Sequence, residues 1–145
     1  HTGVGRAMKR HQLAWAADHR LDWVTWTFDP LVRRNAWFNL DVLRAEVHGY
    51  LVDFYGPLDD AVNQSDESDR LLVAWSTTRD ARERDPRAPG VIAVPTPEDI
   101  VVLRRTDQAA AIAWRHRLRN ELGDRLAAGA DVVGFTRDGN YLLTM

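Results

Sequence analysis

Apolar and polar positions follow a helical period at the start of the chain and a strand-like period soon after. Residues 5–18 are rich in helix-forming side chains, and their pattern predicts a helix with one apolar face. That face is expected to hold Val4, Met8, Trp15 and Ala16. Residues 23–28 are β-branched or aromatic throughout, which predicts a strand. Its apolar side is expected to hold Val24, Trp26 and Phe28.

The middle of the chain predicts one more helix and two more strands. The helix is expected over residues 31–43, and the strands over residues 46–54 and 70–77. The apolar members of these strands are Val47, Leu51 and Val52 in the first and Leu72, Val73 and Trp75 in the second. Residues 63–69 are polar and predict a loop between the strands.

The last part of the chain predicts a connection, a strand, two helices and a hairpin. Residues 79–90 are highly charged and contain two prolines, which is typical of an exposed linker. A short strand over residues 91–94 leads to Thr96-Pro97-Glu98-Asp99, a helix start with threonine as the cap.

A longer helix over residues 107–128 is predicted by apolar residues spaced by four, and Gly129 ends it. Asp138-Gly139 predicts the turn of a hairpin that pairs residues 131–136 with residues 140–144. This succession of helices and strands predicts a mixed α/β or α+β fold.

Composition excludes several function classes. The net charge of −2 gives no bulk argument for nucleic acid or an anionic membrane as a partner. The absence of cysteine excludes disulfides, thiolate metal sites and cysteine nucleophiles. No apolar run reaches the roughly 20 residues that span a bilayer, and no signal peptide is visible. A cytoplasmic location is therefore the default expectation.

The chain opens with a glycine turn that leads directly into the first helix. Gly3 and Gly5 have no side chains, so an anion can approach the backbone closely, and the first N–H groups of a helix are unpaired. Gly3-Val4-Gly5-Arg6-Ala7 is therefore a candidate phosphate cradle, and the alternative is a tight connection without a ligand. Since such a turn normally follows a strand, we expect this chain to be the later part of a longer protein.

Several further stretches accompany this turn: residues 27–31, 34–40, 53–56 and 68–71, Trp75, Val94-Pro95, Trp114-Arg115 and Arg119. Residues 3–9 with their helix, the strand that ends at Phe28-Asp29-Pro30, and Asn35-Ala36 resemble the GNAT acetyltransferase superfamily. The further stretches resemble more closely a poorly characterised branch of predicted acetyltransferases within it. In that superfamily, a Q/R-x-x-G-x-G/A turn binds the coenzyme A pyrophosphate through backbone amides. Gly3 and Gly5 match the last two elements of this motif.

This resemblance implies an acyl-CoA-dependent N-acyltransferase, or its coenzyme-binding portion, that uses acetyl-CoA or another acyl-CoA and an unknown amine acceptor. It implies a GNAT-like mixed sheet flanked by helices. Residues 1–78 would be the C-terminal part of the coenzyme-binding domain, residues 79–90 a linker, and residues 91–145 an extension packed on the same domain. The coenzyme-binding residues implied are Thr2, Gly3, Val4, Gly5, Arg6, Ala7, Thr27, Phe28 and Asn35. Asn35 either helps to place the coenzyme or caps its helix.

This sequence differs from the superfamily pattern in two ways, and both leave a non-catalytic function as an alternative. The strands and helices that precede the glycine turn in the superfamily are absent from this sequence. The tyrosine that protonates the leaving thiolate in many members is replaced by Leu40, or by Val42 in another register, so the catalytic residues stay unassigned. A non-catalytic acyl-CoA-binding or protein-interaction module fits these departures. A homodimer or a missing N-terminal segment could supply the absent wall.

Other candidate residues have both a chemical and a structural interpretation. The five histidines lack metal-ligand spacing, so we expect no metal site. Acid–base chemistry near a pocket is one interpretation of His48, Tyr50 and Tyr55. The favoured alternative is that Tyr50 packs in a sheet and Tyr55 closes a turn. Ser68-Asp69-Arg70 either binds a substrate or, as favoured, pairs locally around a turn.

Aromatic and basic residues are mostly given structural roles. The tryptophans expected in the core are Trp15, Trp26, Trp75 and Trp114. Trp23 and Trp37 are left as candidates for lining a pocket. A solvated helical face is predicted for Arg115, Arg117 and Arg119.

Overall fold

The computed structural model of the chain describes residues 3–56, 67–78, 80 and 83–145. Its helices and strands are, in chain order, α1 (Val4–Asp18), β1 (Trp23–Phe28), α2 (Arg33–Ala36), the π-helix η1 (Trp37–Val42), β2 (Glu46–Leu51), β3 (Arg70–Ser76), β4 (Ile92–Pro95), α3 (Ile100–Thr106), α4 (Gln108–Leu118), the π-helix η2 (Arg119–Gly123), α5 (Asp124–Ala127), β5 (Asp131–Phe135) and β6 (Asn140–Thr144). This order confirms the predicted succession of elements and the mixed α+β class.

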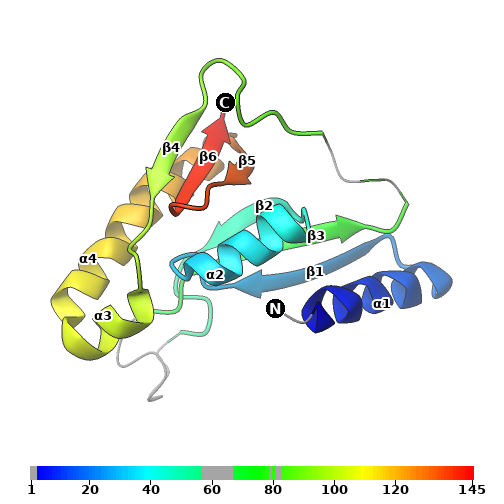
Figure 1. Cartoon of the computed structure of the whole chain (residues 1–145), viewed down its shortest axis with the longest axis horizontal. Coiled ribbons are helices and arrows are strands. Elements are labelled where there is room, and N and C mark those ends of the chain that lie inside the picture. Colours follow the sequence, from blue (N-terminus) through cyan, green and yellow to red (C-terminus); the bar gives the residue numbers. More distant parts are fainter. Residues whose placement is uncertain (1–2, 57–66, 79, 81–82) are drawn as a thin grey trace.

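The strands form two three-stranded sheets, one in the order β1-β3-β2 and the other in the order β4-β6-β5 (Figure 1). All strand pairs among the described residues are antiparallel, so the expected mixed sheet is not found there. In each sheet, two strands that follow each other in the chain pair with each other, and the remaining strand adds to the later of these two. Figure 1 shows α2 and η1 lying over the first sheet and beside the second, with α3 and α4 at one end of the molecule.

The two sheets share one hydrophobic core. Its buried residues include Phe28, Leu31 and Leu71 from the first part of the chain, and Leu118 and Tyr141 from the second. The Tyr141 hydroxyl donates a hydrogen bond of 2.6 Å to the Pro30 carbonyl, which joins β6 to the end of β1. The described residues of 91–145 therefore pack directly on the described residues that precede the linker.

The first helix differs from the prediction in the face that it buries. Val4, Met8 and Trp15 are 57%, 65% and 52% exposed, and only Ala16 of the expected face is buried. The helix contacts the first sheet with a different side, on which the Lys9 ammonium lies 4.1 Å from the centre of the Trp26 ring. The expected core position of Trp15 is therefore wrong. Trp26, Trp75 and Trp114 do pack against the core, as predicted.

The two longer predicted helices both change to π geometry along their length. The first begins at Arg33 and becomes η1, and the second runs as α4, η2 and α5 until Gly129, which has a positive φ of 101°. A spacing of four residues exceeds the 3.6 residues of one α-helical turn, so an apolar stripe with this spacing drifts around the helix. A π turn takes up this drift, and Leu118 and Leu122 both stay fully buried.

Several predicted local assignments are corrected by tertiary contacts. Helix α3 begins at Ile100 and is capped by Asp99, which accepts a bond from the Val102 amide, so Thr96 is not the cap. Thr96 is instead buried between Arg33 and Gly139. In β3, Leu71, Val73 and Ala74 are fully buried, whereas Leu72 is only partly buried.

The predicted solvated face of α4 and η2 is wrong for two of its three arginines. Arg115 is 1% exposed, and Arg119 pairs with Asp69, whereas Arg117 lies at the surface beside Glu121. Val52 follows β2 instead of lying within it, and it is 53% exposed.

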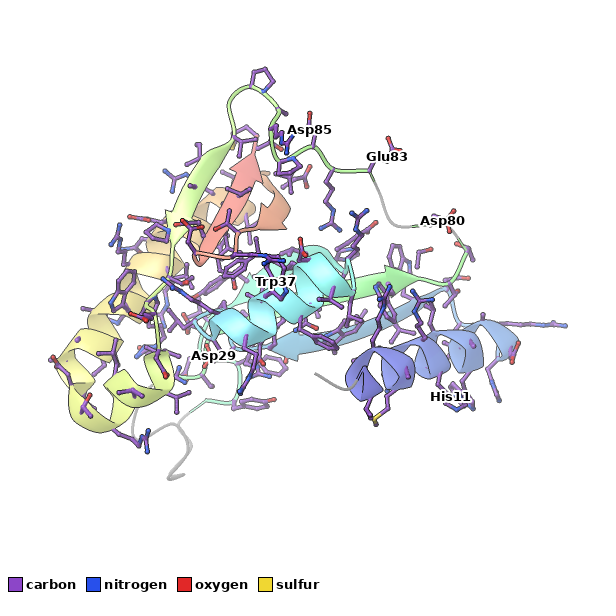
Figure 2. All side chains as sticks on the ribbon, in the orientation of Figure 1. His11, Asp29, Trp37, Asp80, Glu83 and Asp85 are labelled. Carbon is purple, nitrogen blue, oxygen red and sulfur yellow. The ribbon has the colours of Figure 1, made fainter. Side chains whose placement is uncertain are left out.

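The connections between elements largely follow the prediction. The described residues between 79 and 90 form no helix or strand, and Figure 2 shows Asp80, Glu83 and Asp85 along this segment. The Arg84 guanidinium donates a hydrogen bond of 2.9 Å to the Ala45 carbonyl, which links this segment to the connection between η1 and β2. Of the predicted loop over 63–69, residues 63–66 lie outside the described residues, and the remainder is irregular. The closing hairpin is confirmed, with Gly139 in its turn at a φ of 91°.

Candidate functional site

A cleft of about 1140 Å³ opens where the start of α1 meets α2, η1 and the turn between β5 and β6. Residues 3–6 form one side of it, and Arg33, Arg34 and Asn35 of α2 form another. Trp37, Phe38 and Val42 of η1 contribute its apolar surface. Residues 135–137 close it from the C-terminal hairpin, so the site combines the two ends of the chain.

The start of α1 is arranged as an uncompensated positive helix end. Gly3 is the N-cap in the left-handed conformation, at a φ of 75°, and within the described ranges no side chain caps the helix. The first helical hydrogen bond joins the Ala7 amide to the Gly3 carbonyl, so the amides of residues 4–6 precede the helical ladder. The first turn contains no acidic residue. The cleft therefore meets the end of the helix that attracts anions.

The backbone conformation and the packing of α1 also explain why positions 3 and 5 are glycines. Gly3 adopts a conformation that residues with a side chain rarely take. A Cβ at Gly5 would lie 3.2 Å from the Phe38 ring, so glycine there allows α1 to approach η1 closely. The glycine turn thus serves packing at the same point at which it exposes amides to the cleft.

Among the described residues that line the cleft, four are arginines and none carries a carboxylate: Arg6, Arg33, Arg34 and Arg137. Arg33 is fixed by Thr96, since its Nε donates to the hydroxyl at 3.0 Å and its Nη2 to the carbonyl at 2.7 Å. The Arg137 guanidinium lies 5.5 Å from the centre of the Trp37 ring. Figure 2 shows Trp37 on the side of its helix that faces the second sheet. The cleft is therefore strongly positive along more than one wall.

The structure brings together five of the residues that the sequence assigns to the coenzyme: Gly3, Val4, Gly5, Arg6 and Asn35. Ala7 follows on α1 but does not line the cleft. Phe28 is 4% exposed in the core, and both Thr27 oxygens accept bonds from Arg70, so neither faces the cleft. Thr2 lies outside the described residues.

Asn35 does not cap its helix. The N-cap of α2 is Val32, and Asn35 is the third residue of the helix, where its carbonyl accepts a bond of 2.8 Å from the Asn39 side chain. The capping alternative for Asn35 is therefore wrong, and the residue lies at the cleft instead.

Sequence reasoning missed the contribution of the C-terminal hairpin to the cleft. Phe135, Thr136 and Arg137 follow the glycine turn by about 130 residues, and no local pattern connects them with it. Trp37 was a candidate for a pocket and does line the cleft, whereas Trp23 does not. Leu40 is buried and Val42 lines the cleft, and neither aliphatic side chain can donate a proton to a ligand.

A second polar cluster surrounds Asp69, whose side chain is 1% exposed. Its carboxylate accepts bonds from the Tyr50 hydroxyl at 2.6 Å, from the Arg119 Nη2 at 2.7 Å and from the Asp53 amide at 3.0 Å. Burial and the adjacent Asp69 carboxylate raise the pKa of Tyr50 well above its usual value, so this hydroxyl keeps its proton. The expected local pairing of Asp69 is wrong, because Arg119 lies 50 residues away.

Metal and membrane sites find no support in the described part of the chain. It contains no group of three histidine or carboxylate side chains that could hold a metal ion. It also contains no helix that is both long and apolar enough to cross a membrane. Comparison of the chain with known protein families, with curated proteins and with solved structures found no match.

Proposed function

We propose that the cleft binds the phosphates of an acyl-CoA and that the chain is an acyl-CoA-dependent N-acyltransferase or the coenzyme-binding portion of one. The observation that carries this proposal is the meeting of a helix start at Gly3 with four arginines in one cleft, whose described lining residues include no carboxylate. Helix amides bind a phosphate through directed hydrogen bonds, and guanidinium groups pair with phosphate oxygens.

The distribution of charge suits a ligand with phosphates at more than one point. The amides of residues 4–6 would take the diphosphate, while Arg34 and Arg137 lie on other walls of the cleft and would meet a further phosphate on the ribose. A volume of about 1140 Å³ exceeds the range of roughly 300–1,000 Å³ that is usual for small ligands. The cleft therefore has room for an extended nucleotide, with Trp37 and Phe38 as apolar surface.

Acyl transfer at such a site would depend mainly on placing an amine next to the thioester. A non-catalytic acyl-CoA-binding module is the second candidate, and the apolar residues Leu40 and Val42 favour it. Incubation with acetyl-CoA and a set of amines separates the two, because only an acyltransferase releases free coenzyme thiol.

The coenzyme assignment is tested by titrating coenzyme A into the protein in a calorimeter. Arg34 and Arg137 are exposed, so Arg34→Ala and Arg137→Ala should leave the fold intact. Each substitution should weaken binding about fivefold, as expected for the loss of roughly 1 kcal/mol of partly screened charge pairing. Added salt should weaken binding to the unmodified protein further.

The matched control is Arg105→Ala, which removes an equally exposed arginine from the end of α3, away from the cleft. Its affinity should equal that of the unmodified chain. If Arg105→Ala and Arg34→Ala lost equal affinity for coenzyme A, the loss would be explained by net charge alone, and this result would overturn the assignment. So would undiminished affinity after Gly5→Trp in a folded variant, because the indole would fill the space at the helix start.

A further inference from the structure

A second cavity, of about 420 Å³, lies between β2, the end of the long helical run and the start of β5. His48, Gly49 and Tyr50 of β2 line one side, and Gly129 and Asp131 line another. A Cβ at Gly49 or Gly129 would meet no atom within 4 Å, so these positions leave the cavity open and its backbone accessible.

The polarity of this cavity is opposite to that of the arginine-lined cleft. The described residues of its lining include Asp131 and no lysine or arginine. Ala127 and Gly129, at its edge, mark the C-terminal end of the helical run that begins at Gln108. The C-terminal end of a helix carries the negative pole of its dipole. A cation is therefore favoured here, whereas an anion is favoured in the first cleft.

His48 enters this cavity through an irregularity of β2. The register with β3 shifts between Val47 and Gly49, so His48 occupies a bulge, a feature that redirects a side chain. Its Nε2 lies 3.2 Å from a Glu46 carboxylate oxygen. An ionised carboxylate only accepts, so Nε2 carries the hydrogen and Nδ1 is the acceptor of the neutral ring. Glu46 thus positions the ring without lining the cavity.

Residues of strand β5 line both cavities. Asp131 at its start lines the second cavity, and Phe135 at its end lines the first cleft. Four residue steps at about 3.3 Å each separate these positions by about 13 Å. The pantetheine arm of a coenzyme held in the first cleft is longer than this distance.

We propose that the second cavity is the acceptor site, that it binds a primary ammonium group beside Asp131, and that His48 Nδ1 takes the proton. This inference rests on the proposed acyl-CoA function. The neutral amine then attacks the thioester carbonyl carbon, a C–N bond forms and the C–S bond breaks. The departing thiolate takes the second proton from the attacking nitrogen, and the imidazolium returns its proton to water.

The cation site is tested without coenzyme, using butylammonium chloride as the probe and the ring signals of His48 in NMR spectra as the readout. Butylammonium should shift these signals to saturation, and potassium butyrate at the same ionic strength should not. Asp131→Asn should weaken the binding about fivefold. Glu98→Gln, which removes an exposed carboxylate from a residue outside the cavity, should leave it unchanged. Equal responses to the two salts would overturn the inference.

Catalysis is tested with acetyl-CoA and butylamine by following thiol release. His48→Gln should lower kcat at least tenfold with the affinity for coenzyme A unchanged, because the ring is 38% exposed and remote from the first cleft. An unchanged kcat in His48→Gln would overturn the role of His48. The two proposals can fail separately. If the protein binds coenzyme A but does not bind butylammonium, only the acceptor site is contradicted. Ammonium binding without any coenzyme binding removes the acyl-CoA function.

Discussion

At the scale of single residues, the buried carboxylate of Asp69 joins the first sheet to η2. Its carboxylate accepts two bonds from Arg119 of η2, one from Tyr50 of β2 and one from the Asp53 amide. A buried carboxylate is stabilised only when its oxygens have partners, and here both oxygens have two. Asp69 therefore fixes the position of η2 against the first sheet.

The substitution Asp69→Asn should destabilise the protein by about 3 kcal/mol, because a neutral amide leaves the partly buried Arg119 charge with only the more distant and more exposed Glu67 as a counterion. Urea unfolding followed by circular dichroism measures this loss. Glu121→Gln is the matched comparison, since the Arg117–Glu121 pair lies at the surface of the same helical run. It should lower the free energy of unfolding by less than about 0.5 kcal/mol. Similar losses in the two variants would contradict a special role for Asp69.

At the scale of elements, prediction succeeded where the signal is local. The aromatic and β-branched run of β1 and the Asp138-Gly139 turn are both contained in a few residues, and both were placed correctly. The exposure of Trp15 and the burial of Arg115 were not predictable in this way. They depend on which side of a helix other elements cover, and the periodicity of one helix does not contain that information.

The residues of the candidate site also differ in whether a local sequence signal could predict them. Its first wall, residues 3–6, was found because glycine and a helix start are neighbours in sequence. Asn35 was assigned to the site only through the resemblance to the GNAT superfamily. Arg137 was missed because the C-terminal hairpin carries it to α1 from the other end of the chain. Strand pairing and the shared core bring the hairpin close to α1. Both depend on the whole folded chain, so no local sequence pattern predicts them.

The turn of that hairpin offers a test at the scale of one element. Gly139 has a φ of 91°, and a Cβ there would collide with the Arg33 guanidinium. Gly139→Ala should therefore lower the stability by about 3 kcal/mol, combining backbone strain with displacement of Arg33 from Thr96. Gly129→Ala, at a φ of 101° with open space around it, should cost only the strain of about 1 kcal/mol. Thermal unfolding compares the two, and equal shifts would rule out the clash with Arg33.

At the scale of the whole molecule, two tyrosine hydroxyls hold distant elements together. Tyr141 of β6 donates to the Pro30 carbonyl, and Tyr50 of β2 donates to Asp69. Burial raises the pKa of both well above the usual value near 10, and for Tyr50 the Asp69 carboxylate adds to the effect. Both hydroxyls therefore stay protonated in the folded chain at a pH at which the unfolded chain would lose their protons.

This difference makes alkaline unfolding a test of whether the two sheets form one cooperative unit. Below pH 10 the stabilisation by both tyrosines is complete. Above it the unfolded chain binds fewer protons than the folded one, so stability should fall by about 1.4 kcal/mol per pH unit for each tyrosine. Lys9, whose pKa is lowered by burial, acts in the opposite direction, but its contribution is complete near pH 10.4.

Because the sheets share one core, the amide NMR signals of Val73 in β3 and Leu143 in β6 should disappear together as the pH rises. The phenolate absorbance of Tyr50 and Tyr141 should appear in the same step. Tyr141→Phe should halve the pH dependence, because only Tyr50 then releases a proton on unfolding. Loss of the Leu143 signal at a lower pH than that of Val73 would instead show that the hairpin detaches first. The cleft would then have a wall that opens independently of α1.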